Sequence, residues 1–343
     1  MRKNNQANLL HDQLTHFLMQ HREFALLFFQ TILDDETVQD IQWETFERLH
    51  DRHTSESLHA TVNDIAYTVL YQNSRLLHLI FVLEHKSYLP SQAYPIQYQL
   101  QYYASQHMKR HYDNQAADAE AEEGDETTEN LSVFPTPQPL LVVIYHGEKP
   151  WQVPTLAQHY SMAKTNAFLQ SQVMHIPYIL VDLNKRTDEE IISFYGKAIS
   201  FCAGLLALKH VWDEDLLPLI KQVLDLYLQE QPTEDEVSKR GAIFVYLLRA
   251  LRKREDFDRV TDYLKANKNK YRDIMSYFDI VLEEKKQEGK IEGKAEGIEE
   301  NTVNVIVKAL KAARYTLEEI ANLTDKDVAY VQTIKAKLAS GQL

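Results

Sequence analysis

The chain has 343 residues, 44% of them hydrophobic and 25% charged, which is an ordinary globular balance for roughly two domains. Its one cysteine, Cys202, excludes a disulfide framework and a cysteine-based zinc site, and its apolar surroundings predict a core thiol. The net charge of −13 argues against a uniformly basic nucleic-acid binder, but residues 114–130 hold seven acids and no base, so the rest carries only −6.

The beginning of the chain and its longest apolar runs bear on where the protein works. Residues 1–8 lack the apolar stretch of a signal peptide, and no run reaches the roughly 18 apolar residues that a membrane span needs. We therefore expect a cytoplasmic protein with no membrane partner.

Residues 11–33 predict a helix, because apolar side chains recur at spacings of mostly three and four without an intervening Pro or Gly. Asp12 suits the capping and dipole of a helix N-terminus, and a catalytic role for His11 and Asp12 is the alternative. A long packing helix at the start of the chain is the expectation.

Two strands are predicted next, at 61–71 and 76–86, because both segments are rich in β-branched, aromatic or aliphatic residues. The short polar link between them, 72–75, predicts a hairpin. Residues 95–111 have a Gln- and Tyr-rich helical pattern, and the acidic and then Pro-rich segment 114–138 predicts a flexible insertion.

Further strands at 140–145 and 178–183 complete the expected first domain, which is an α/β or α+β fold with a mixed sheet ending near residue 185. The following region is helical in pattern, with helices expected at 188–208, 213–229, 233–254 and 256–284. The charged tail has glycines every four residues from Gly289 to Gly297, typical of a surface helix or hinge, and ends in a segment like a helix-turn-helix. The expected division is therefore 1–185, 186–284 and 285–343.

Asp64, Glu84 and Lys86 are the residues that best fit a chemical role. Alternation along a strand puts Glu84 and Lys86 on one face, and a suitable hairpin register would bring Asp64 beside them. Two carboxylates can hold Mg²⁺ or Mn²⁺, and a neighbouring ammonium can orient an attacking water. The set predicts phosphodiester hydrolysis at a divalent metal.

The alternative is that Glu84 and Lys86 merely end a buried strand where it reaches solvent, since this short pattern is frequent by chance. Two details favour the site. An unpaired Asp64 would be costly to bury in its apolar strand, and Gln99 and Tyr103 share one helix face that could cover the same position.

Several segments together resemble the recombination-promoting nuclease/putative transposase (Rpn) family of the PD-(D/E)XK nuclease superfamily. They are HDQLTHFL at 11–18, NDIAYTVLY at 63–71, LIFVLEHKS at 79–87, QLQYYASQHMKRH at 99–111 and PLLVVIYHGEKPW at 139–151. The Gly-spaced tail and the segment after it also look like that family's C-terminus. The resemblance therefore spans most of the chain.

The resemblance implies a restriction-endonuclease-like core and a metal-dependent DNA endonuclease that promotes DNA recombination or mobile-element movement. Asp64 and Glu84 would be the ligands of Mg²⁺, or of Mn²⁺ or Ca²⁺, with Lys86 in the third motif position, where relatives often carry Gln. Gln99 and Tyr103 match the Gln-x-x-x-Tyr arrangement of some superfamily nucleases. DNA is the expected partner, with a homodimer through the helical C-terminal region, and a noncatalytic interaction or DNA-binding protein is the alternative.

Overall fold

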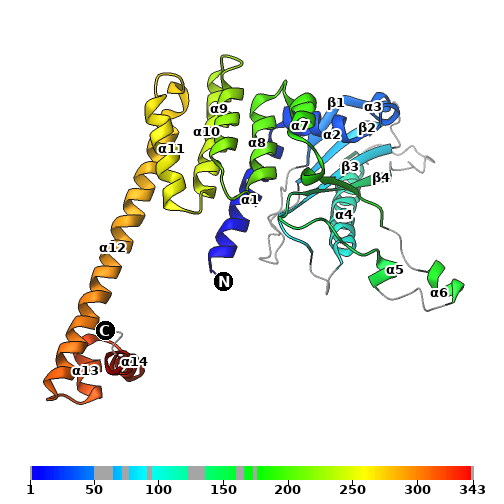
Figure 1. Ribbon diagram of the computed structural model, residues 1–343. Helices are drawn as coiled ribbons and strands as arrows, with labels where there is room; N and C mark the ends of the chain where they lie inside the picture. The colour runs from blue at the N-terminus through cyan, green and yellow to red at the C-terminus, as the bar shows by residue number, and fades with distance from the viewer. Residues whose placement is uncertain are drawn as a thin grey trace. The chain divides into compact units, whose positions relative to one another are not determined.

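The computed structural model describes residues 2–49, 65–71, 77–90, 95–122, 136–159, 166–172 and 176–340. By its contacts the chain divides into two compact units, Met1–Met275 and Ser276–Leu343. The first unit holds the sheet and most of the helices, and the second holds most of one long helix and two short ones (Figure 1). The predicted three-part division of the chain stays a prediction.

Strands and helices alternate irregularly along the first unit. The strands are β1 (Ile41–Arg48), β2 (Ile65–Tyr71), β3 (Leu77–Lys86), β4 (Thr136–Tyr145) and β5 (Ile179–Asp182). The helices up to β5 are α1 (Arg2–Gln20), α2 (Arg22–Ile32), α3 (Asp35–Asp40), α4 (Ile96–Glu122), α5 (Leu156–His159) and α6 (Ala167–Ser171). The later helices are α7 (Asp188–Tyr195), α8 (Ile199–His210), α9 (Leu217–Tyr227), α10 (Glu234–Ala250), α11 (Arg254–Ala266) and α12 (Met275–Ala312), with short 3₁₀ turns at Leu183–Lys185 and Arg272–Ile274.

The five strands form one sheet in the order β1-β2-β3-β4-β5. β1, β2 and β3 pair antiparallel, whereas β3, β4 and β5 pair parallel. The predicted mixed sheet and the antiparallel partnership of the two hairpin strands are confirmed, although residues 61–64 and the link 72–75 lie outside the described residues. β1 was not predicted, because a shift of register between Gln42 and Glu47 interrupts its alternation of apolar and polar residues.

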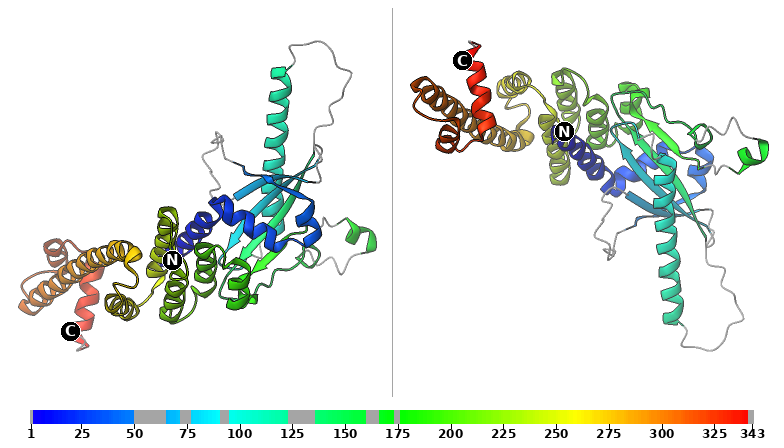
Figure 2. Two further views of the ribbon diagram at one scale, coloured as in Figure 1. Left: turned by 90° about the horizontal axis from the view of Figure 1, so that it is seen from above. Right: turned by 90° about the horizontal axis from the view of Figure 1, so that it is seen from below.

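Helices cover both faces of the sheet (Figure 2). α4 packs on one face, where Ile96, Leu100 and Tyr103 share a buried cluster with Val143 and neighbouring residues of the sheet. On the other face, Tyr67 of β2 is fully buried, and its ring lies 4.6 Å from that of Phe46 and 5.8 Å from that of Phe29 on α2. Neighbouring side chains of β2 therefore enter two separate helix–sheet interfaces, Ala66 in the α4 cluster and Tyr67 on the opposite face.

The predicted helix at 11–33 is two helices that meet at His21, whose backbone is extended. The side chain of the next residue, Arg22, donates to the carbonyl oxygens of Phe46 and Trp43, so the break is held by contacts with β1. Because α1 begins at Arg2, Asp12 lies within the helix, and the expectation that it caps the N-terminus is wrong.

The acidic segment contains more regular structure than its composition predicted. α4 continues to Glu122 and β4 begins at Thr136, so both ends of the expected insertion at 114–138 are helix or strand. Residues 123–135 lie outside the described residues. An acidic composition lowers the expected burial of a segment. It does not prevent a helix that begins in the preceding, packed residues, as α4 does, from continuing into the acidic residues.

In the second unit α12 passes through Gly289, Gly293 and Gly297 as a continuous helix, so of the two expected alternatives the helix is correct. It is followed by α13 (Leu317–Thr324) and α14 (Val328–Ala339), which confirm the two short helices predicted there. Asp325, in the left-handed conformation, ends α13, and the Asp327 side chain caps α14. No helix in the described part of the chain is long and apolar enough to cross a membrane.

Candidate functional site

Glu84 and Lys86 lie on the same face of β3, close to the end of the strand, as the sequence predicted. The Lys86 Nζ is 2.6 Å from the Glu84 Oε1, and both side chains are buried, at 10% and 2% exposure. β3 is the central strand of the sheet. Among the described residues its pairing with β2 reaches Leu83, and its pairing with β4 continues through Glu84 and Lys86, so the two side chains project from a paired strand. Their pairing places an anion and a cation together in a poorly solvated position.

Gln99 and Tyr103 lie one turn apart on α4 and reach the same position. The amide nitrogen of Gln99 is 3.0 Å from the Glu84 Oε1 and 2.7 Å from the Tyr103 hydroxyl oxygen. Burial of Ile96 and Leu100 fixes α4 against the sheet, and the four-residue spacing then aims both polar side chains at Glu84. Four of the five residues predicted for the site are therefore in one place, and their catalytic role stays a prediction.

Within this set, the Glu84 carboxylate has one oxygen without a hydrogen-bond donor among the described residues. Its Oε2 is buried and accepts no hydrogen bond from any residue that the structure describes. Burial raises the pKa of Glu84, and the charge of Lys86 acts in the opposite direction. A buried carboxylate oxygen without a donor is costly, and a bound cation would satisfy it.

The described residues do not contain a complete set of protein ligands for a metal. No three His, Cys, Asp or Glu side chains among them converge for that purpose. Asp64, the predicted second ligand, lies outside the described residues. Mg²⁺ commonly uses only one or two carboxylates and keeps several waters, so the donor chemistry of Glu84 fits such an ion.

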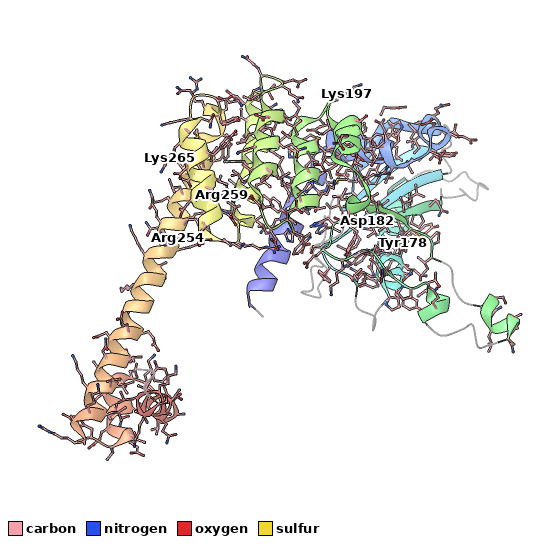
Figure 3. All side chains as sticks on the ribbon, viewed as in Figure 1. Tyr178, Asp182, Lys197, Arg254, Arg259 and Lys265 are labelled. Atoms are coloured by element: carbon pink, nitrogen blue, oxygen red, sulfur yellow. The ribbon has the colours of Figure 1, made fainter. Side chains whose placement is uncertain are left out.

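Asp182 is an acid at the same end of the sheet that the sequence reasoning missed. Asp182 is the last residue of β5 (Figure 3). The register pairs it with Tyr145 of β4, which in turn pairs with Lys86. Asp182 is buried, which raises the pKa of its carboxyl, and its Oδ1 accepts from the Asn184 backbone nitrogen at 3.1 Å. The position of Asp182 near the end of the predicted strand 178–183 is the sequence feature that could have identified it.

A group of histidines lies behind Glu84 and Lys86, on the other face of β3. His85 Nε2 is 2.6 Å from His146 Nε2, and His85 Nδ1 is 2.9 Å from Asp12 Oδ1. His11 Nδ1 is 2.8 Å from the Tyr246 hydroxyl oxygen. The sequence singled out His11 and Asp12, and strand alternation turns His85 away from its two neighbours. That these residues meet His146 and Tyr246 could not be predicted, because the members come from distant segments.

Acidification is expected to destabilise the first unit through His11. Burial is the main cause that lowers the His11 pKa from 6.5 to about 4. Because the folded pKa is the lower one, the stability that neutral His11 supports is complete above pH 6.5 and is lost as the pH falls toward 4. Between pH 7 and pH 5 this amounts to about 2 kcal/mol.

Urea unfolding at both pH values, for the native chain and for His11→Gln, checks this expectation. The variant starts from a lower stability because it disturbs the Tyr246 contact, so the comparison is the loss between the two pH values. The loss should be smaller in the variant by about 2 kcal/mol. Equal losses in the two chains would contradict the assignment.

Comparison with known protein families gives a match. A family model described as "Putative transposase, YhgA-like" matches residues 10–238, a stretch that contains Glu84, Lys86, Gln99 and Tyr103. No curated protein and no solved structure matches the chain. The match covers more than half of the sequence and confirms the resemblance found in its motifs. The chain therefore belongs to the YhgA-like putative transposase family, within the Rpn/PD-(D/E)XK group.

Proposed function

We propose that this protein is a metal-dependent DNA endonuclease that hydrolyses phosphodiester bonds and promotes DNA recombination or mobile-element movement. Family membership supports the broad role in transposition or recombination. The observation that carries the finer proposal is the buried Glu84 carboxylate, with one oxygen paired to Lys86 and the other without a donor among the described residues. The mixed sheet with α4 on one face is, in this proposal, the restriction-endonuclease-like core.

Asp64 is proposed as the second acid of the site. The supporting observation is the register of the described strands, in which Ile65 pairs with Leu83. In the sequence Asp64 directly precedes Ile65, and Glu84 directly follows Leu83. In an antiparallel pair, residues directly opposite each other point to the same face, so this register is the one that a shared site requires.

Glu84 and Asp64 would hold Mg²⁺, with Mn²⁺ or Ca²⁺ as alternatives. The ion would polarise the phosphoryl oxygen and neutralise charge that develops during hydrolysis. The Lys86 ammonium would orient the attacking water and stabilise the negative phosphorane-like state. Gln99 would hold the Glu84 Oε1 in position, and Tyr103 would in turn fix the Gln99 amide.

DNA is the proposed substrate, and a homodimer is part of the same proposal, because two copies of a one-site nuclease can cut both strands. Ile291, Ile298 and Val305 on α12 are 69%, 58% and 42% exposed. They recur every seven residues, which is the spacing of a coiled-coil seam. Light scattering at working concentration measures the oligomeric state.

Plasmid cleavage by the purified protein, with Mg²⁺, Mn²⁺ or EDTA, tests the proposed activity. The native chain should nick or cut DNA only when a divalent metal is present. Asp64→Ala and Lys86→Ala should abolish the cleavage while remaining folded by circular dichroism. Ser171→Ala, at an exposed position on α6, is a control that should retain activity.

A noncatalytic interaction or DNA-binding protein with the same fold is the second candidate. The 2.6 Å ion pair between Glu84 and Lys86 favours it, since a carboxylate committed to a lysine resembles a structural pair. Equal activity near background in the native chain and both variants, at every metal concentration, would support this candidate and reject the nuclease.

A further inference from the structure

The end of β3 that carries Glu84 and Lys86 is held from behind by a connected set of aromatic side chains and the partly exposed Asp12. His85 lies between these two residues in the sequence and points to the opposite face, where its side chain is 8% exposed. Its ring lies nearly parallel to the ring of His146, with centroids 4.8 Å apart and planes inclined by 22°. His85 therefore fills the space directly behind the proposed site.

Polar contacts fix the His85 ring at both nitrogens. Nδ1 is 2.9 Å from the Asp12 carboxylate on α1, and Nε2 is 2.6 Å from Nε2 of His146. A nitrogen–nitrogen pair at that separation shares one proton, so each ring restricts the orientation of the other. The His85 ring thus has little freedom to rotate or to shift along the strand.

His146 extends this network to the helices. Its backbone nitrogen donates to the Lys86 carbonyl oxygen at 3.2 Å, and its own carbonyl oxygen accepts from the Trp212 indole at 2.7 Å. The His146 side chain is fully buried, and the ring of His11 meets it edge-on at 5.3 Å. His11 in turn contacts Tyr246 on α10 at 2.8 Å. The end of β3 is consequently connected to α1, α10 and the segment that follows α8.

Any movement of the backbone at residue 85 moves Glu84 and Lys86 together, because they are its two neighbours on the strand. Reactions that depend on oriented groups are sensitive to this, and a displacement of about 1 Å can cost ~100-fold in rate. Mutation of a residue that supports a metal ligand commonly lowers metal affinity or activity by roughly 10- to 100-fold. A network with this many fixed contacts is suited to such a role.

We propose that Asp12, His85 and His146 are positioning residues, which act through β3 to fix Glu84 and Lys86 in their reactive arrangement. This inference rests on the proposed nuclease function. The three residues do not touch DNA or metal, and their contribution is to the geometry of the groups that do.

Steady-state cleavage by His85→Ala, with the full chain and over a range of Mg²⁺ and plasmid concentrations, is the primary test. Per folded molecule, kcat should fall roughly 100-fold and half-saturation by Mg²⁺ should rise about 10-fold, with KM for DNA changed by less than about threefold. His85→Asn, whose amide nitrogen can replace Nδ1 opposite Asp12, should restore at least about a tenth of the native kcat. A merely structural role would lower the folded fraction and leave these values per folded molecule unchanged.

Asp12→Asn provides a second variant in case His85→Ala does not fold, since the Asp12 side chain is 38% exposed. It should lower kcat about 10-fold. The matched control is His16→Ala on the same helix, where the ring lies 3.3 Å from Arg48 and outside the network, and its kcat should be native.

The outcomes separate this inference from the proposed function. If Asp64→Ala loses the cleavage activity of the native chain, but the His85 and Asp12 variants keep it per folded molecule, the positioning role alone is overturned. Absence of metal-dependent cleavage in the native chain overturns both. Loss in the His85 and Asp12 variants, rescue by His85→Asn and native activity in His16→Ala support the positioning role.

Discussion

Glu84→Gln is expected to reduce metal-dependent DNA cleavage by at least roughly 10²- to 10³-fold, the usual effect of removing one electrostatic group from a reaction centre. The substitution keeps the size and shape of the side chain. It removes the negative charge that would hold the cation and that now balances Lys86 at 2.6 Å. Plasmid cleavage at saturating Mg²⁺ measures the effect, and activity within threefold of the native chain would contradict the assigned role.

Metal binding by the same variant gives a readout that does not depend on cleavage. Mg²⁺ that binds only the folded chain raises its melting temperature by mass action, with a gain of about 2.7 kcal/mol at 100 times the dissociation constant. The native chain should show this rise in a thermal unfolding experiment, and Glu84→Gln should not. A native rise that persists in the variant would place the metal elsewhere.

The same substitution should also destabilise the fold, because it leaves the ammonium of Lys86 buried without its carboxylate. Breaking a buried pair in this way costs about 3–5 kcal/mol, whereas replacing both members by uncharged residues is often neutral. The double variant Glu84→Gln/Lys86→Met should therefore recover stability in urea unfolding while remaining inactive. This separation of stability from activity distinguishes a reaction site from a structural ion pair.

The part of the site that could be predicted from sequence is the part that depends on local periodicity. Two-residue alternation on β3 placed Glu84 beside Lys86, and four-residue spacing on α4 placed Gln99 beside Tyr103. Both are properties of a single strand or helix. The two pairs meet because α4 packs on the sheet. The helical pattern in the sequence indicated an amphipathic face but not the surface against which it packs.

The residues behind β3 could not be predicted, because their contacts join segments far apart in the chain. His85 meets a residue 73 positions away at Asp12 and one 61 positions away at His146. Local rules assigned Asp12 to a helix cap, whereas in the structure it lies within α1. His146 is fully buried, and its partners in the network come from other elements of the fold.

Phe201→Ala is expected to lower the free energy of unfolding of the first unit by about 3–5 kcal/mol, the usual cost of a cavity left by a buried phenyl ring. Phe201 lies on α8 and is fully buried. Its ring stacks on Phe24 of α2 at 5.2 Å and meets Tyr195 of α7 edge-on at 5.2 Å. The helices that follow the sheet in sequence therefore share a core with the helix that precedes it.

The shared core predicts that the sheet and the helices α7–α11 unfold together. Urea unfolding followed by near-UV and far-UV circular dichroism should show both signals of the first unit moving to lower urea by the same amount in Phe201→Ala. Phe194→Ala on α7 is the matched control, since it deletes the same ring at 45% exposure and should cost less than about 1 kcal/mol. If the far-UV transition shifts while the near-UV transition of the sheet stays in place, the helices fold independently of the sheet. The network behind β3 would then join two parts of the first unit that unfold separately.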